Sequence, residues 1–479
     1  MTEASSTIRA LARAVRAVPA DGVSPAAMRQ AQLLLLDTIG CGLAGAREPA
    51  AQALAEFALA NAGKPQCVLI GRGQRTDVLN AVLANGAAIR VLDWNDYFVS
   101  EAKGEPEAGG HPSDNIPVAL AVAGARGRSG AETLRTIAIG YELYARLQHL
   151  MNRAGVWDGV TVSGLVAAAM AGRLMELDEE PLSHALALAA ARAPTPSAVR
   201  SGHLSAAKSI ANALVAEAGV QAALLAERGL TGPLAILDDP RGLRDLFSHA
   251  DPALLIEPIP QAGAIMRALV KTYPCINTGQ SAVAAALRLH EMFARKTSPL
   301  PGPPTPAGEE NISRIEIVMA DYKVTKRHQE DPGRARPQSR EAADHSFPFL
   351  VAVALIDGQF GIAQFENERW RDPHVVALME RTVMRRDAGW NARAPGGFPC
   401  TIRAWDSAGH EHVAEIPYPP GFSRDGLDAD SVIAKFHSAA ASILSEPRRA
   451  RVVDAVMEFH HSPSAKELEA AIATEEMNR

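Results

Sequence analysis

The fold is decided by the stretch Val162-Ser-Gly-Leu-Val-Ala-Ala-Ala-Met-Ala-Gly-Arg-Leu-Met175, which is apolar on almost every side when wound as a helix. A helix that is hydrophobic all round is buried inside a protein rather than laid on its surface. Leu33–Leu36 has the same character. Gly164, Gly172 and the alanines between them let neighbouring helices approach closely. The sequence therefore predicts a core of tightly packed helices.

Helical signals continue outward from this stretch. Ser129-Gly-Ala-Glu132 is a capping box, which predicts the start of a helix. Gly229, followed by Gly232-Pro233, predicts the end of another. The pattern remains helical to about residue 270, and one further helix is predicted over 282–293.

Strand signals appear only after residue 271. Apolar residues alternate with polar ones over Ile315–Met319, which predicts a half-buried strand. Thr401–Trp405 and Glu411–Ile416 flank a turn-forming Asp-Ser-Ala-Gly segment, which predicts a hairpin. Residues 430–444 return to a helical pattern. We therefore predict a mainly α fold with an α+β insertion: a helical domain in two parts, residues 1–270 and 422–479, and a smaller α+β lid domain, residues 271–421.

Composition narrows the class of protein. Hydrophobic residues make up 47% of the chain but aromatic residues only 5%, which favours close-packed helices of Ala, Leu, Val and Ile. A net charge of −6 argues against a global nucleic-acid-binding surface. The four cysteines form no CxxC pair, which favours a reducing compartment, and no apolar run reaches the roughly 18 residues that cross a bilayer. We expect a cytoplasmic protein without nucleic-acid or membrane partners.

The first candidate site combines Leu92-Asp93-Trp94-Asn95-Asp96-Tyr97 with His111-Pro-Ser-Asp-Asn115. Carboxylates and an imidazole suit acid–base chemistry. Residues 112–115 fit a helix N-terminus, where free N–H groups suit an anionic ligand. Residues 99–110 are predicted to be a loop, and the alternative interpretation is helix capping beside a solvated loop. In a functional site, Asp93 and His111 are the catalytic candidates, and Asp96, Tyr97 and Ser113 contact the substrate.

Two lysines are further candidates. Lys271 lies in Lys271-Thr-Tyr-Pro274, at the predicted domain junction, where it can pair with a substrate carboxylate; a surface lysine is the alternative. Lys208 stands alone among Ala, Ile, Val and Leu, so it is predicted to be buried. A buried lysine needs an anion, and we expect a ligand carboxylate or Glu217 beside it.

A basic run follows the predicted lid strand. It can present positive charge to a polyanion, although a solvated loop is the alternative. Its members are Lys323, Lys326, Arg327, His328, Arg334, Arg336 and Arg340, and it ends in Asp344-His345-Ser346. Arg340 and His345 are taken as substrate contacts. No GxSxG elbow accompanies the Asp-His-Ser trio, which argues against a serine-hydrolase triad.

The sequence predicts no metal and no organic cofactor. Walker A and HExxH motifs do not occur. His410-Glu-His412 and His460-His461 lack a matched third ligand in the sequence.

Taken together, these segments resemble the MmgE/PrpD family, in order along almost the whole chain. Each motif is weak alone, and the resemblance rests on six in register. They are Leu35 to Gly45, Leu92-Asp93-x-Asn95-Asp96, His111 to Ile116, Gly219 to Pro233, Lys271-x-Tyr-Pro with Gln280-Ser281, and Arg340 to Ser346.

The resemblance implies a fold, an activity and a site. The family includes 2-methylcitrate dehydratase, cis-aconitate decarboxylase and iminodisuccinate epimerase. Its members have a mostly helical domain and a smaller α+β lid, are usually homodimers, and need no metal or organic cofactor. The active site lies between the domains. Positions that match the family site are Asp93, His111, Lys271, Lys208 and, in a loosely aligned part of the lid, Tyr322.

The implied chemistry begins with loss of a proton next to a carboxylate, which builds negative charge on that carboxylate. Lys271, Lys208 and Arg340 can hold the carboxylates, while Asp93 or His111 carries the proton. The first hypothesis is a hydro-lyase of the 2-methylcitrate dehydratase type acting on a small hydroxylated di- or tricarboxylate. Alternatives are a decarboxylase of the cis-aconitate type, an epimerase, or a non-catalytic carboxylate-binding protein.

The sequence also departs from the family pattern. Tyr97 stands where members often carry Thr, and residues 99–110 make a longer connection before His111. Members usually carry a histidine at or beside Asp158, and another at the position of Thr278. These departures point to a shifted substrate or to another proton carrier, such as Tyr97 or Asp158.

Overall fold

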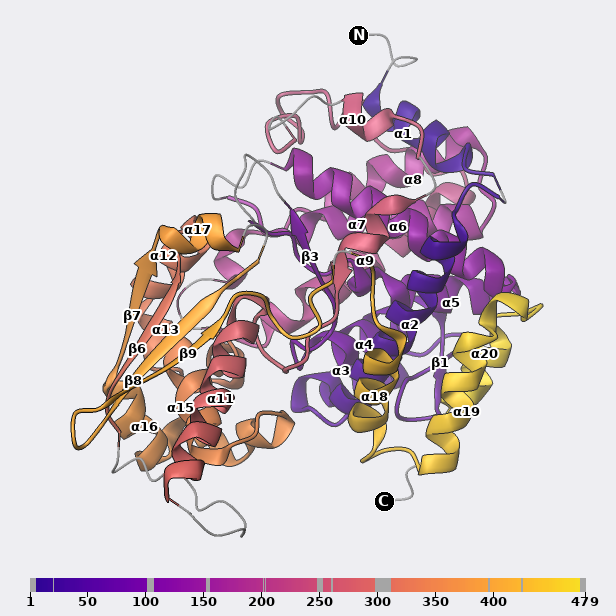
Figure 1. Cartoon of the computed structure of the whole chain (residues 1–479). Coiled ribbons are helices and arrows are strands. Elements are labelled where there is room, and N and C mark those ends of the chain that lie inside the picture. The colour runs from indigo at the N-terminus through magenta and orange to yellow at the C-terminus, as the bar shows by residue number, and fades with distance from the viewer. Residues whose placement is uncertain are drawn as a thin grey trace.

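The computed structural model describes most of the chain. The described residues are 6–19, 21–100, 107–151, 156–200, 202, 204–247, 253–259, 262–297, 312–394, 397–423 and 425–473. Figure 1 shows a larger helical part and a smaller lid that contains a four-stranded sheet.

The helical part is a bundle built around two central helices, α7 (Thr161–Leu174) and α9 (Ala207–Glu227). They pack against each other and against α8 (Glu179–Arg192), and α9 also contacts α4 (Val78–Arg90). The surrounding helices are α1 (Thr7–Arg16), α2 (Pro25–Gly45), α3 (Pro49–Ala60), α5 (Ile116–Arg126) and α6 (Gly130–Leu150). The mainly helical fold is confirmed, and so is the burial of the stretch that begins at Val162.

Two helix ends lie where local signals predicted them, and the structure shows a serine cap at the start of a third helix. Ser129 and Glu132 form both hydrogen bonds of the capping box that opens α6. Helix α9 ends at Glu227, and Gly229 follows with a positive φ of 86°, which glycine adopts without strain. Ser24 caps α2 through the N–H of Ala27.

Small residues bring α7 and α9 together. A methyl group added at Gly219 would lie 2.5 Å from the carbonyl oxygen of Gly164 and 2.6 Å from the Cβ atom of Ala167. The two helices therefore approach to a distance that only glycine allows at this crossing.

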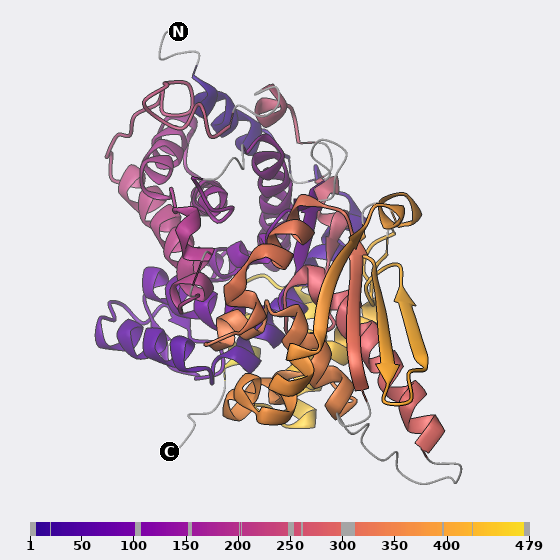
Figure 2. The same ribbon diagram turned by 90° about the vertical axis from the view of Figure 1, so that its left-hand side faces the viewer.

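The lid is a sheet covered by helices. Its strand order is β7 (Thr382–Asp387), β6 (Ile312–Ala320), β8 (Cys400–Asp406) and β9 (Glu411–Ile416). The predicted strand and hairpin are confirmed as β6 and as the antiparallel pair β8–β9. Helix α11 (Gln280–Thr297) packs on β8 and β9, and α15 (Phe347–Asp357) packs on α11. Figure 2 shows the sheet beside the helical part.

Two short helices carry the predicted basic run. They are α12 (Lys323–Glu330) and α13 (Pro332–Ala335), and α14 (Arg340–Ala343) follows them. The alternative of a purely irregular solvated loop is therefore wrong. The remaining lid helices are α16 (Pro373–Glu380) and α17 (Gly389–Arg393).

The chain then returns to the helical part. Helix α18 (Ala429–Ala440) packs against α2, α19 (Glu446–Met457) contacts α2 and α18, and α20 (Lys466–Ile472) contacts α5 and α19. In Figure 1 these yellow helices lie beside the indigo and purple first helices. The predicted helix over 430–444 ends four residues early, at Ala440.

Within the predicted loop over 99–110, residues 99, 100, 107 and 108 form strands instead, and residues 101–106 lie outside the described part of the chain. Strand β3 (Tyr97–Ser100) pairs with β4 (Glu107–Ala108), and its start pairs with β5 (Ala268–Leu269). The short strands β1 (Cys67–Val68) and β2 (Arg75–Thr76) form a separate pair, and α10 (Ala253–Ile256) lies on the surface of the bundle. Gly- and Glu-rich composition concealed β3 and β4 because backbone pairing across the chain supplies their stability.

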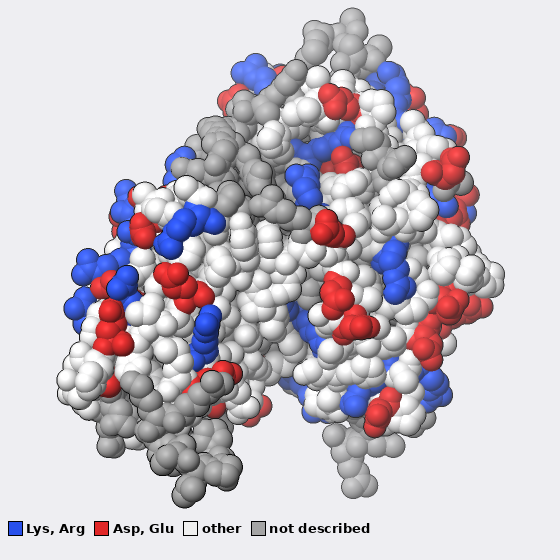
Figure 3. All heavy atoms as spheres, viewed as in Figure 1, with Lys and Arg blue, Asp and Glu red and all other residues white. Residues whose placement is uncertain are grey.

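Helix α9 is long and apolar enough to cross a membrane by length and composition alone. In this structure 67% of its apolar window is buried inside the protein, as expected of a core helix. Helices α15 and η8 (Ile362–Arg371) pass the same test only as one span, but they meet at a bend of 114°. On the face seen in Figure 3, basic and acidic side chains are interspersed over both the helical part and the lid.

Candidate active site

The site is organised around Asp93, three residues beyond the end of α4. Its backbone has a positive φ of 50°, a conformation that costs a non-glycine residue free energy and is common at functional sites. The ammonium group of Lys271 donates to the Asp93 backbone oxygen at 2.7 Å and to its Oδ1 atom at 2.5 Å. Lys271 thus holds both the backbone and the side chain of Asp93.

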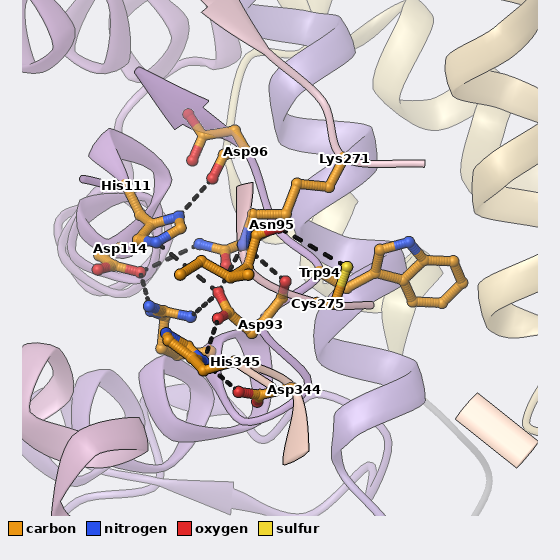
Figure 4. Close-up of polar contacts among 12 residues, drawn as sticks. Asp93, Trp94, Asn95, Asp96, His111, Asp114, Lys271, Cys275, Asp344 and His345 are labelled. Atoms are coloured by element: carbon orange, nitrogen blue, oxygen red, sulfur yellow. Dashed lines mark hydrogen bonds and ion pairs between the residues drawn. The ribbon is translucent and has the colours of Figure 1, made fainter. Parts of the chain in front are cut away.

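Three cations surround the Asp93 carboxylate, as Figure 4 shows in part. Arg90 Nη1 lies 2.5 Å from Oδ1, beside Lys271, and Lys208 Nζ lies 3.4 Å from Oδ2. Burial alone would raise the pKa of Asp93, but these cations outweigh it and hold the pKa well below its usual range. Asp93 is therefore an ionised structural anion rather than a free base.

Lys208 joins Asp93 to a second carboxylate. Its Nζ atom lies 3.1 and 3.2 Å from the two oxygens of Asp344, and its side chain is buried. The expectation of an anion beside Lys208 is confirmed, but the expectation of Glu217 is wrong. Two long-range carboxylates take that place, and sequence neighbours on one helix gave no hint of them.

His345 lies beside the same group. Its Nδ1 atom contacts Asp344 Oδ1 and lies 3.7 Å from Asp93 Oδ2. Burial, with help from Lys208, lowers the pKa of His345 to about 3, so the ring is neutral near pH 7. Ser346 instead caps α15 through the N–H of Phe349, which rules out an Asp-His-Ser triad among these three residues. We call Arg90, Asp93, Lys208, Lys271, Asp344 and His345 the Asp93 cluster.

His111 faces this cluster with a free ring nitrogen. Its Nδ1 atom lies 2.5 Å from the backbone oxygen of Asp96, and a carbonyl can only accept, so Nδ1 carries the proton. Burial, Arg90 and Lys271 hold the pKa of His111 well below its usual value. The ring is therefore neutral, and its Nε2 atom carries a lone pair. This Nε2 atom lies 3.8 Å from Asp93 Oδ1.

Asp96, Ser113 and Tyr97 lie behind this histidine. Asp96 accepts hydrogen bonds from the Ser113 hydroxyl at 2.5 Å and from the Tyr141 hydroxyl at 2.8 Å, and Figure 4 shows its carboxylate turned away from Asp93. Burial raises the pKa of Asp96 to about 7. Tyr97 is buried at the start of β3. None of the three lines the cavity described below, so the geometry does not support direct substrate contact.

A cavity of about 1140 Å³ opens beside the cluster, lined by both the helical part and the lid. His111, Lys208 and His345 line it, together with Arg90 and Asp93. The chain therefore brings residues that are more than two hundred positions apart to one hollow. Lys271 is completely buried behind Asp93 and does not reach the cavity wall.

Two predicted contacts lie elsewhere. Arg340 Nη1 donates to the Val91 backbone oxygen at 2.8 Å, and its guanidinium lies over the Phe365 ring. Tyr322 packs in a small apolar cluster with Trp390 and Phe398. Neither lines the cavity, so neither holds substrate carboxylates in this arrangement.

Sequence reasoning missed three residues of the cavity wall. Arg90 is almost fully buried and pairs with Asp93, a spacing of three residues that an otherwise apolar helix end could have signalled. Asp114 lies 3.9 Å from Arg90 Nε, and burial raises its pKa to about 6. Arg200 Nε contacts Asp158 Oδ2 at 2.6 Å, where an ion pair stands in place of the expected histidine. No sequence signal marked Arg200.

The same group also has the composition of a metal site. Asp93, Asp344 and His345 offer ligand atoms within 4.8 Å of one another. The cations Arg90, Lys208 and Lys271 already lie against the two carboxylates and outnumber them, so a metal ion would add positive charge to a group that already has an excess of it.

Comparison with known proteins agrees with this arrangement. Residues 9–255 match the MmgE/PrpD N-terminal domain model, and residues 273–459 match the MmgE/PrpD C-terminal domain model. The chain is 25% identical to a 2-methylcitrate dehydratase of Salmonella typhimurium, over 90% of this chain and 89% of that protein. It is 24% identical to a human cis-aconitate decarboxylase, over 92% and 89% of the two chains. A cis-aconitate decarboxylase-like protein of Aspergillus oryzae is 23% identical, over 96% and 94%.

Both family models match in order and together span most of the sequence, on either side of the cavity that the helical part and the lid share. The chain belongs to the MmgE/PrpD family.

Proposed function

We propose that this protein is a lyase that removes water from a small hydroxylated di- or tricarboxylate, in the manner of a 2-methylcitrate dehydratase, with side chains as its only catalytic groups. The observation that carries the proposal is the neutral His111 ring, whose Nε2 lone pair faces a buried, cation-lined cavity end. A base beside fixed cations is what removal of a proton next to a carboxylate requires.

In this mechanism Lys208 and Arg90 hold the substrate carboxylate that gains negative charge as the proton leaves. His111 Nε2 takes the proton from the neighbouring carbon, and Asp93, 3.8 Å away, stabilises the resulting imidazolium. The carbon–oxygen bond then breaks, and His111 returns the proton to the departing hydroxyl, which leaves as water. The double bond forms, and the histidine ends neutral.

Lys271 acts through Asp93 in this proposal. Its two hydrogen bonds to Asp93 keep the carboxylate directed at His111 and stabilise the left-handed backbone. We therefore assign Lys271 a positioning role rather than contact with substrate. Asp96 has a similar role, because its backbone oxygen fixes the tautomer of His111.

Decarboxylation is the second candidate, because relatives of comparable identity are described as cis-aconitate decarboxylases. It would use the same cations to stabilise charge after loss of carbon dioxide. The fold and the cationic cavity suit both reactions, so only the products distinguish them.

The test is to incubate the purified protein with 2-methylcitrate, citrate and cis-aconitate. Enoate absorbance reports dehydration, released carbon dioxide reports decarboxylation, and solvent deuterium uptake without net conversion reports epimerisation. Dehydration that disappears in His111→Gln supports the proposal. A rise in melting temperature with these acids but no turnover indicates a non-catalytic binding protein instead. If none of the three acids is converted or raises the melting temperature, small polycarboxylates of this kind are excluded as substrates.

The expected assembly comes from the family resemblance, and the expected location comes from the four cysteines and the apolar runs of the sequence. We propose a homodimer in the cytoplasm, which light scattering on the purified protein and localisation of a tagged full-length chain would test.

A further inference from the structure

The cavity has a second cationic region that the proposed reaction at His111 does not use. Among the described residues that line it there, six basic side chains face three acidic ones, so the region carries net positive charge. We call the basic set the outer cation group. Its members are Arg200, Lys323, Lys326, Arg327, Arg334 and Arg336.

This group is assembled from both parts of the molecule. Arg200 ends the short 3-10 helix η4 (Ser197–Arg200) of the helical part, whereas the others come from α12, α13 and the residue after α13 in the lid. The two parts touch here: a Cβ atom placed on Gly333 would lie 3.0 Å from the carbonyl oxygen of Gly202. Cations from opposite walls therefore face the same space.

Arg334 is the best-built member of the group. Its side chain is only 7% exposed, yet it lines the cavity. Asp331 Oδ2 accepts from its Nε atom at 3.1 Å, and His328 Nδ1 accepts from its Nη1 atom. Thr278 lies 3.1 Å from His328 Nε2 on the other side of the ring. A buried network thus fixes the direction of the guanidinium.

Several donors of the group have no protein acceptor. Within the described part of the chain, nothing accepts from Arg334 Nη2 or from the two terminal nitrogens of Arg200. Lys323 has no carboxylate within 4.0 Å among those residues either. These donors line the cavity, and an anionic ligand group there would accept charge-assisted hydrogen bonds from them.

The size of the cavity points the same way. Its volume of about 1140 Å³ exceeds the roughly 300–1000 Å³ of pockets that enclose drug-sized ligands. A citrate-sized acid at His111 and Lys208 would fill only a fraction of this space and would not reach the outer cation group.

We infer that the substrate is an extended acid, with a reacting carboxylate end at His111 and a further anionic group, a carboxylate or a phosphate, at the outer cation group. This inference rests on the proposed lyase function, because that function places the reacting end. Arg200 then contacts the terminal anion through its two terminal nitrogens, a bidentate contact that a guanidinium fork suits, and Arg334 adds a hydrogen bond from its Nη2 atom.

The test compares citrates that carry different extensions at the methyl position of 2-methylcitrate. The probes are butyl, ω-carboxybutyl and ω-phosphonobutyl citrate, with 2-methylcitrate as the reference. Calorimetric titration of the purified full-length protein measures their Kd values. We expect at least one anionic extension to bind ten-fold or more tightly than the butyl extension. The anion that binds more tightly identifies the terminal group.

Variants then locate the effect. Lys323→Gln/Lys326→Gln on the exposed face of α12 and, separately, Arg200→Gln should each remove most of the ten-fold advantage and leave binding of 2-methylcitrate within two-fold. Lys64→Gln/Arg451→Gln removes two exposed cations outside the cavity and should change nothing. Equal binding of butyl and anionic extensions, or an advantage that survives the cavity variants, overturns the inference.

The outcome separates this inference from the function on which it rests. If 2-methylcitrate is dehydrated but no anionic extension binds better than butyl, the outer site is wrong and the lyase proposal stands. If the anionic extensions bind through Arg200 but no acid in the panel is converted, the outer site stands and the lyase proposal is wrong.

Discussion

His111 is the residue whose protonation state carries most of the proposed chemistry. Burial and two neighbouring cations hold its pKa well below the usual 6.5. Activity should therefore persist as the pH falls from 8 to 6.5, and kcat/KM should decline only below that range. The unfolded chain binds a proton at this histidine near pH 6.5 and the folded chain does not, so lowering the pH below 6.5 also reduces the free energy of unfolding.

Replacing His111 tests this directly. His111→Gln keeps a side chain of similar length but removes the base, so kcat should fall by roughly 10²–10⁴. Thermal melting should remain close to that of the unchanged protein, since the ring is at the cavity wall. A variant that keeps more than a tenth of kcat, or a wild-type pH profile that falls already at pH 7, would contradict the assignment of His111 as the base.

Asp93 gives a prediction about stability rather than rate. Asp93→Asn leaves Lys208 with Asp344 and Arg90 with Asp114, but it leaves Lys271 without a carboxylate among the described residues. Breaking such a buried ion group costs on the order of 3–5 kcal/mol. Lys271→Met removes one of those cations, so Asp93→Asn/Lys271→Met should recover part of the loss. Urea unfolding of the four proteins measures the coupling. Strictly additive changes would show that the two side chains do not interact.

For single residues, the sequence could indicate which residue types the site contains but not which of them contact one another or face the cavity. A lone lysine in an apolar helix predicts an anion, and Asp93 and Asp344 supply it for Lys208. That Lys271 lies behind Asp93, and that Tyr322 is packed against Phe398, depends on side-chain directions in the folded chain. Motif order carries no such information.

Among the elements, helices α7 and α9 pack so closely that a side chain larger than glycine does not fit between them at Gly219. Gly219→Ala would place a methyl group 2.5 Å from the Gly164 oxygen and 3.0 Å from the Ala168 nitrogen. Backbone atoms cannot move aside as a side-chain tip can, so the helices must separate, at a cost of about 1–3 kcal/mol. Thermal or urea unfolding measures it. Gly263→Ala is the control and should be neutral, because among the described residues no atom beyond its chain neighbours lies within 4 Å of the added methyl group. A Gly219→Ala protein as stable as this control would contradict the packing described.

Elements with local signals were predictable, and elements made by distant pairing were not. The capping box of α6 and the alternation of apolar and polar residues in β6 each involve residues that are close together in the sequence. Strand β7, by contrast, has no buried residue and exists because it pairs in parallel with β6, about seventy residues earlier. Helices α12 and α13 were visible only as a basic run, because their orientation toward the cavity depends on how the lid docks.

For the whole molecule, three segments of the chain meet at the Asp93–Trp94 backbone. Lys271 from the start of the lid binds the Asp93 oxygen, and Trp94 Nε1 donates to the Thr272 oxygen at 3.0 Å. Lys435 from the returning helix α18 donates to the Trp94 oxygen at 2.7 Å. The return of the chain to the helical part therefore contributes to the site as well as to the core.

Lys435 also carries a buried ion pair, since its Nζ atom lies 2.6 Å from Asp37 Oδ1 on α2. Burial raises the pKa of Asp37, and Lys435 limits that rise.

Lys435→Met leaves the Asp37 carboxyl without its cation and should lower the free energy of unfolding by on the order of 3–5 kcal/mol. In Asp37→Leu/Lys435→Met an apolar pair replaces the ion pair, so urea unfolding should show most of the stability restored. The Trp94 oxygen still lacks its donor in this double variant, so kcat should stay reduced. Full recovery of kcat together with stability would show that α18 supports the fold and has no part in positioning Asp93.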